Sequence, residues 1–146
     1  MGSRETYRYW LAIPTRFSDN DMLGHINNVV YFRFFETVVV RFLIEQARLN
    51  WQADPIIPFA IDIGCRFRRP LAYPETIDAG LVIGTLGTSS VRYDIALYAE
   101  GDPAAAAIGH FVHVYVDRMT ERPVPIPAPI RAVYERFAAP AAAQNR

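Results

Sequence analysis

The sequence predicts an α+β protein in which a five-stranded antiparallel sheet wraps around one long central helix, with a short helix near the C-terminus. Its hydrophobic segments follow the order strand, helix, then four strands. The helix expected over residues 29–49 is apolar nearly all round, as buried helices are, so one sheet must curl to cover it. A length of 146 residues suits one domain. We therefore expect a single domain over 1–146, with a core at about 7–137 and a frayed tail at 138–146.

The first strand and the long helix are separated by a polar segment. Aromatic and β-favouring residues predict the strand over 7–16, and Pro14 favours an edge position or a strand end. Asn27 or Asn28 is the expected N-cap of the helix. Its length excludes a strand, despite three consecutive valines. One narrow polar stripe recurs along it at Arg33, Thr37, Arg41 and Glu45.

Four strands are expected after the helix, and a short Gly-Thr-Ser turn joins the second and third of them as a hairpin. A proline-rich stretch then ends the sheet before the last helix. Five strands around one helix leave open sheet edges, and pairing in a dimer is one way to cover them. The expected strands are 57–67, 76–86, 90–99 and 105–117, and the last helix is 130–137.

The composition excludes several classes of function. Charges balance, whereas nucleic-acid binders normally carry a basic excess, so no nucleic-acid partner is expected. All basic residues are Arg, which excludes lysine Schiff-base chemistry and leaves Arg, backbone N–H groups or hydroxyls to hold any phosphate. No apolar run reaches membrane-spanning length, and the N-terminus lacks a signal pattern. The lone Cys65 excludes an internal disulfide and favours a cytoplasmic location.

The polar segment 18–28 concentrates chemically able side chains directly before the helix. Asp21 is a candidate general base or nucleophile, and the free N–H groups at the helix start could stabilise an oxyanion. Together they suit acyl transfer to water. The alternative is that Asp19, Asp21 and Asn27 only cap the helix and favour its dipole.

Other candidate groups have simpler explanations. The sequence lacks a nucleophile elbow and a glycine-rich phosphate loop. Asp19, Asp21 and His25 lack the companion ligands of a metal site, so no metal is expected. His25 is either a site residue or a turn residue, and Glu36 is expected to meet an Arg or the backbone. His110 and His113 are expected as strand residues, and Arg66, Arg68 and Arg69 as either a solvated strand end or a holder of a phosphate-bearing tail.

A resemblance to a known family comes from the run Asp19–Glu36, which has the pattern D-x-D-x-x-G-H-x-N-N-x-x-Y-x-x-F-F-E. It resembles the signature of hot-dog-fold acyl-CoA thioesterases, and most closely the 4-hydroxybenzoyl-CoA thioesterase-like group. The resemblance extends over about 7–137, including Phe67–Pro70 and the Arg122–Pro127 tail. It implies the hot-dog fold, with one sheet wrapped around a central helix.

The resemblance also implies roles for individual residues. Asp21 matches the catalytic carboxylate, and Asn28 matches the residue whose backbone N–H polarises the thioester carbonyl. His25 is similar in place to a site histidine of plant acyl-ACP thioesterases, although this chain has Leu23 where those enzymes carry an Asn. The family implies a homodimer with joined sheets, often a tetramer, with sites at the subunit interface.

The sequence thus predicts an acyl-CoA thioester hydrolase that needs no cofactor, since coenzyme A is part of its substrate. Asn27 and Tyr31 are expected substrate contacts beside an apolar acyl pocket, and Arg68 and Arg69 are expected to meet the CoA phosphates. No membrane partner is expected. A hydratase or dehydratase of the same fold and a non-catalytic acyl-CoA-binding protein remain the alternatives.

Overall fold

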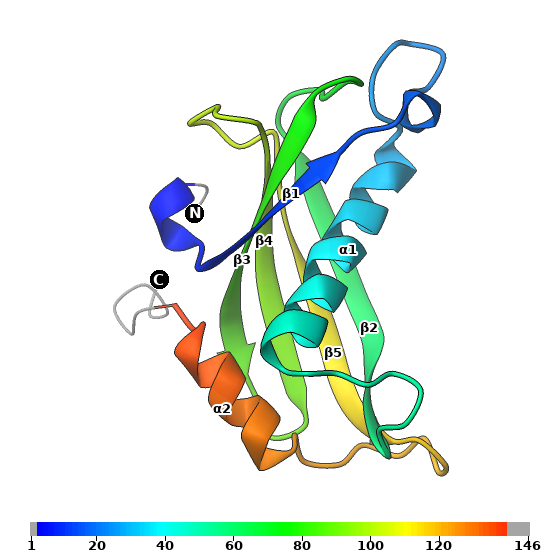
Figure 1. Ribbon diagram of the computed structural model, residues 1–146, viewed down its shortest axis with the longest axis vertical. Helices are drawn as coiled ribbons and strands as arrows, with labels where there is room; N and C mark the ends of the chain where they lie inside the picture. Colours follow the sequence, from blue (N-terminus) through cyan, green and yellow to red (C-terminus); the bar gives the residue numbers. More distant parts are fainter. Residues whose placement is uncertain (1–2, 140–146) are drawn as a thin grey trace.

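The structure, a computed structural model, describes residues 3–139 and forms a five-stranded antiparallel sheet curled around α1 (Figure 1). The strand order is β1-β3-β4-β5-β2, so β1 and β2 are the two edges. This confirms the predicted fold class. In chain order the elements are η1 Arg4–Thr6, β1 Tyr9–Pro14, η2 Phe17–Asp19, α1 Asn28–Gln46, β2 Ile56–Phe67, β3 Thr76–Leu86, β4 Ser90–Ala99, β5 Ala107–Asp117 and α2 Ala128–Arg136.

The core lies between α1 and the concave side of the sheet. Strand residues alternate as predicted on β5, where Phe111 and Tyr115 are buried while His110 is only partly so. Phe42 of α1 packs edge-on against Phe137 and stacks near Tyr134, which ties α2 to the far half of α1. Because α1 is held along its length, its N-terminus has a fixed place beside the sheet. Seven buried side chains of α1 contribute to this core: Tyr31, Phe34, Phe35, Val38, Val39, Phe42 and Leu43.

A cluster of polar side chains lies inside this core. The Tyr93 hydroxyl is 3.0 Å from Nδ1 of His113 and 2.7 Å from the Tyr134 hydroxyl. The Tyr134 hydroxyl is also 2.6 Å from that of Tyr115. Hydrogen bonding among these groups offsets the cost of burying them. His113 is thus a strand residue with a structural partner, as predicted.

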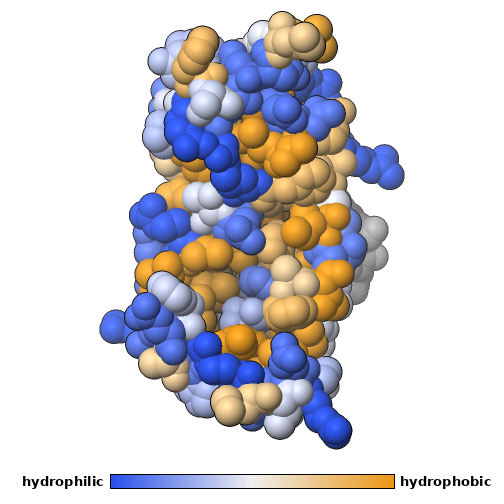
Figure 2. Space-filling view, turned by 90° about the vertical axis from the view of Figure 1, so that its right-hand side faces the viewer, coloured by the Kyte–Doolittle hydropathy of each residue, from blue (hydrophilic) through white to orange (hydrophobic). Residues whose placement is uncertain are grey.

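The sheet packs against one side of α1, and several large apolar residues of α1 and of the edge strand β2 are exposed. Figure 2 faces the side of the molecule on which β2 lies and shows several orange, apolar patches among the polar ones. We call the exposed large apolar residues of these two elements the open strip: Val29, Phe32 and Ile44 on α1, with Phe59, Ile61, Ile63 and Phe67 on β2.

Element ends differ from the predictions for local reasons. α1 ends at Gln46 because Arg48 adopts a positive φ of 55°, which helical backbone does not allow. α2 begins at Ala128 rather than Ile130, and Pro129 fits its first turn. Backbone N–H groups in the first turn have no intrahelical acceptor, so the lack of an N–H in proline costs no hydrogen bond there. The expected frayed tail starts with Ala138 and Ala139, but Ala139 donates its N–H to the Ile83 carbonyl at 3.1 Å. The remainder of that tail, 140–146, lies outside the described residues.

Candidate functional site

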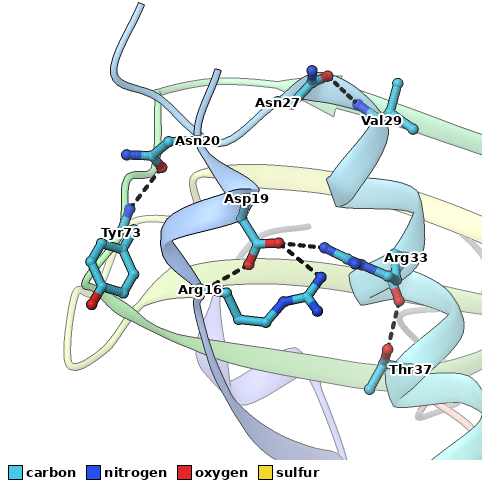
Figure 3. Close-up of polar contacts among 8 residues, drawn as sticks. All are labelled: Arg16, Asp19, Asn20, Asn27, Val29, Arg33, Thr37 and Tyr73. Carbon is cyan, nitrogen blue, oxygen red and sulfur yellow. Dashed lines mark hydrogen bonds and ion pairs between the residues drawn. The ribbon is translucent and has the colours of Figure 1, made fainter. Parts of the chain in front are cut away.

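The N-terminus of α1 begins at Asn28, directly after the cap residue. The side-chain oxygen of Asn27 accepts the N–H of Val29 at 3.1 Å, so Asn27 is the cap of the two asparagines considered (Figure 3). Helix geometry leaves the N–H of Asn28 without an intrahelical acceptor. A donor at the positive end of the helix dipole is therefore presented at this point.

Asp21 sits in a tight turn that precedes the helix. Its Oδ1 accepts the N–H of Leu23 at 2.9 Å and that of His25 at 3.4 Å, while its own N–H donates to the His25 carbonyl at 2.8 Å. Gly24 closes the turn with a φ of 83°, a left-handed conformation that favours glycine. Within the described residues, Oδ2 of Asp21 accepts no hydrogen bond. The turn thus fixes the carboxylate through one oxygen and leaves the other for a ligand.

A pocket of about 380 Å³ opens at this helix end. One side of it comes from the turn and the first helical residue, and the other from the end of β2. Six residues predicted for the site line it, whereas Asn27 and Arg66 do not. The lining residues are Asp21, Leu23, His25, Ile26, Asn28, Tyr31, Phe67, Arg68, Arg69 and Pro70.

Two aromatic rings contribute to the apolar part of the pocket, beside Leu23 and Ile26. Tyr31 is buried, and its ring meets that of Phe67 edge-on, with centroids 4.8 Å apart. Burial raises the pKa of the Tyr31 phenol, so it stays neutral at physiological pH. The sequence indicated Phe67 only as part of the family pattern, and the structure shows that Phe67 lines the pocket.

The arginines at the end of β2 form the charged rim. The backbone N–H groups of Arg68 and Arg69 both donate to the carbonyl of Ala106, at 2.8 and 3.1 Å, which fixes the strand end. The Arg69 side chain pairs with Asp102, with 2.5 Å between Nη1 and Oδ2. Arg68 forms no ion pair within residues 3–139. Its guanidinium is therefore available to an anionic group.

Asp19 contributes more than sequence reasoning assigned to it. Its carboxylate is only 1% exposed and pairs with Arg33 of α1 and, at 3.3 Å, with Arg16 (Figure 3). Burial raises the pKa of the Asp19 carboxyl, but hydrogen bonds from Arg16 and the Arg33 guanidinium outweigh this and hold it below its usual value. The position of Arg33 on the polar stripe of the helix was visible in the sequence, but its partner was not.

The structure also bears on metal binding and membrane spanning, neither of which the sequence favoured. In the described part of the chain, no group of three or more His, Cys, Asp and Glu is placed to hold a metal ion. Over the same residues, no helix has the length and apolar character needed to cross a membrane.

Comparison with known proteins identifies the family of this chain. Residues 15–134 match the model of the thioesterase-like superfamily. The chain belongs to this superfamily. It is therefore an enzyme with thioesterase activity, as the sequence predicted, and the 4-hydroxybenzoyl-CoA group within the family stays a prediction. A search of curated proteins found no match.

Solved structures agree with the family assignment. The PA5185 protein from Pseudomonas aeruginosa strain PAO1 is 41% identical, with 96% of this chain and 98% of that chain covered and a TM-score of 0.92. The PA2801 protein from Pseudomonas aeruginosa is 30% identical, with coverage of 87% and 96% and a TM-score of 0.80. A thioesterase from Thermus thermophilus, solved with coenzyme A and Zn, is 24% identical with coverage of 97% and 98%, and its TM-score of 0.78 indicates the same fold.

Proposed function

We propose that this thioesterase hydrolyses acyl-CoA thioesters with Asp21 as its catalytic carboxylate and the Asn28 N–H as its oxyanion donor. The observation that carries the proposal is that one pocket is lined by Asp21, by the first residue of α1 and by two arginines. A carboxylate, a helix N-terminus and a cationic rim are the parts that hydrolysis of a phosphate-bearing thioester requires.

The helix end provides stabilisation for the charge that develops on the substrate. When the thioester oxygen lies at the Asn28 N–H, negative charge forms at the positive end of the helix dipole. One such preorganised donor is typically worth about a hundredfold to a thousandfold in rate. The buried core contacts of α1 hold this donor in place before the substrate arrives.

Asp21 can act by two routes, which the free Oδ2 serves equally. As a general base it takes a proton from water while the water oxygen attacks the carbonyl carbon; the C–S bond then breaks, and the CoA thiolate takes up the proton. As a nucleophile its oxygen forms a mixed anhydride with release of the thiolate, and water then hydrolyses the anhydride. Single-turnover hydrolysis in oxygen-18 water separates these routes, since only the second places label in the enzyme.

His25 and Asn27 have supporting roles in this proposal. His25 lines the pocket next to Asp21, where its ring can position water. The Asn27 side chain instead caps α1, so it acts on the site through the helix start. Tyr31 and Phe67 form an apolar wall for the acyl group.

Coenzyme A is the proposed carrier because of the arginine rim. Arg68 and Arg69 flank the pocket mouth, and guanidinium groups bind phosphate oxygens well. The structurally similar Thermus thermophilus thioesterase was solved with coenzyme A, which supports the same carrier here. With coenzyme A as part of the substrate, the proposal includes no separate cofactor.

A homodimer, or a dimer of such dimers, is the proposed assembly. β2 is an edge strand, and the open strip consists of its exposed apolar residues together with those of α1. Unpaired edges of this kind invite pairing with another chain. Two copies joined through their β2 strands would cover both features. A cytoplasmic location stays a prediction.

The test is release of free thiol from a panel of acyl-CoAs, with wild type and Asp21→Asn compared. We expect at least one good substrate and a loss of about a hundredfold or more in kcat for Asp21→Asn. Glu135→Gln, an exposed carboxylate on α2 away from both the pocket and the β2 edge, is the matched control and should hydrolyse at the wild-type rate.

Three outcomes would contradict the proposal. Equal rates for wild type and Asp21→Asn across the panel would remove Asp21 from catalysis. Crotonyl-CoA distinguishes the hydratase alternative, because hydration consumes the double bond without releasing thiol. Tight acyl-CoA binding with no turnover of any substrate would instead favour a binding protein.

A further inference from the structure

The turn that carries Asp21 is closed at both ends by one residue. The Asp19 carboxylate accepts hydrogen bonds from the side chain of Arg33, on the second turn of α1, and from the backbone N–H of Arg16 at 2.8 Å (Figure 3). The Asp19 carbonyl accepts the N–H of Asn27 at 2.9 Å. Asp19 therefore joins the start of the turn to both the cap and the second turn of the helix.

The segment between these two ends, residues 20–26, is short and internally paired. Asn20 and Ile26 form an antiparallel bridge, so the turn is a small closed loop. Its outer side is attached to the segment after the arginine rim: the Ile26 N–H donates to the Leu71 carbonyl at 2.8 Å, and the Tyr73 N–H donates to the Asn20 side chain at 3.0 Å. The loop is thus attached to residues 71–73, which follow the pocket's arginine rim, and to α1 through the Asp19–Arg33 pair.

We propose that the Asp19–Arg33 ion pair is a positioning device that sets Asp21 relative to the Asn28 N–H. Asp21 is two residues after Asp19, and Asn28 directly follows the Asn27 N–H that Asp19 holds. The positions of both groups proposed to act on the thioester therefore depend on one buried residue, Asp19. This inference rests on the proposed function, since it assigns how that site is held.

The burial of Asp19 gives the pair its strength. A carboxylate that is 1% exposed needs its partners, because a buried charge without them is costly. Removal of the Arg33 guanidinium takes away the ion pair that joins Asp19 to α1, while the Arg16 contacts remain within the loop segment. The loop is then less firmly held against the helix, and a displacement near 1 Å can cost about a hundredfold in rate.

Arg33→Met tests the pair, and Arg41→Met is its matched control. Arg41 lies two turns further along the same polar stripe and pairs with Glu45 at 2.6 Å, away from the loop. We expect Arg33→Met to lower kcat by about tenfold to a hundredfold with KM within about twofold, because substrate contacts remain while the reacting groups are misplaced. Arg33→Lys should recover part of kcat, and Arg41→Met should keep the wild-type value.

Hydrogen exchange gives a readout that does not depend on turnover. Amides in residues 20–27 should exchange faster in Arg33→Met than in wild type, while those of β4 keep their protection. If wild type hydrolyses no acyl-CoA, the proposed function fails, and the exchange result still decides the positioning role. Should Arg33→Met fail to fold, Asp19→Asn, which keeps the side-chain shape and loses the charge, replaces it with the same expected effects.

Three results would overturn the inference. One is an equal kcat for Arg33→Met and Arg41→Met. A second is a change confined to KM, which would assign Arg33 to substrate binding. The third is unchanged exchange across residues 20–27 in a folded Arg33→Met protein.

Discussion

The two halves of α1 meet two different kinds of polar environment. At its N-terminal end, Asp21 and Asn28 line a pocket, and each offers an atom that forms no hydrogen bond within residues 3–139. Toward its other end, the helix packs against Tyr93 and Tyr134, and the Tyr93 hydroxyl bonds both Tyr134 and His113 inside the core. Similar chemical groups thus have two roles. At the open pocket they are available to bind a ligand, and in the core they bond one another and contribute to stability.

The difference lies in what each group is bonded to rather than in residue type. His25 is exposed and lines the pocket, whereas His113 is 6% exposed and bonds the Tyr93 hydroxyl. The comparison predicts that changes at the open end reduce activity without unfolding the protein. Changes in the buried cluster should do the reverse.

At the open end, the substitution with the largest expected effect on kcat is Asn28→Pro. Proline lacks the N–H proposed as the oxyanion donor, and the first helical position tolerates it. The preceding Asn27, with φ of −61° and ψ of 138°, already has the extended backbone that a residue before proline needs. We expect kcat to fall by about a hundredfold to a thousandfold with the melting temperature little changed.

Asn28→Ala is the control for this change, because it removes the side chain and keeps the N–H. Steady-state thiol release measures kcat for both variants, and thermal unfolding by circular dichroism measures their stability. An equal loss in both variants would assign the effect to the side chain and contradict the backbone role.

The buried end is tested by pH, through His113. Burial lowers its pKa to about 4 in the folded protein, against about 6.5 in the unfolded chain. Above pH 6.5 neither state is protonated there, so stability is complete. As pH falls toward 4, only the unfolded state gains a proton, and the free energy of unfolding decreases by about 1.4 kcal/mol per pH unit. Between pH 6.5 and 5 this amounts to about 2 kcal/mol.

Urea unfolding at several pH values measures this slope. His113→Gln should remove most of it, although the variant itself starts from a lower stability. His110→Gln is the control, since His110 is a less buried histidine on the opposite face of the same strand. A slope that persists in His113→Gln would assign the pH dependence to other groups.

Much of this contrast could be predicted where it depends on neighbours in sequence. Asp21, His25 and Asn28 lie within one turn and a helix start, so their proximity follows from local chain geometry. The alternation of β5 likewise placed His113 on one face and His110 on the other. Periodicity and turn signals therefore predicted the order of elements and the core of the site.

Contacts between distant segments were not predictable in the same way. The pairing of Asp19 with Arg33 depends on how the loop meets the helix, and that of Arg69 with Asp102 depends on sheet registry. The bonding of Tyr93 to both His113 and Tyr134 requires the placement of three elements. The open strip was missed because burial of α1 depends on how far the sheet curls, which hydrophobic periodicity does not encode.

The smallest expected effect is a change in KM at the arginine rim of the pocket. Arg68 lines the pocket without an ion pair inside the described chain, so its proposed partner is a phosphate of coenzyme A. Arg68→Gln should raise KM for acyl-CoA by about twofold to fivefold with kcat unchanged, as expected for a solvent-exposed charge pair. Acyl-N-acetylcysteamine, which lacks the phosphates, should show no change in KM.

Arg92→Gln is the control for this last comparison, because Arg92 pairs with Asp94 on β4 at 3.0 Å and does not line the pocket. Its KM for acyl-CoA should equal that of wild type. Added salt should reduce the difference between wild type and Arg68→Gln, because screening weakens an exposed ion pair. An equal rise in KM for both thioesters would mean that Arg68 acts on the acyl end, and the rim would then belong to the catalytic part of the pocket.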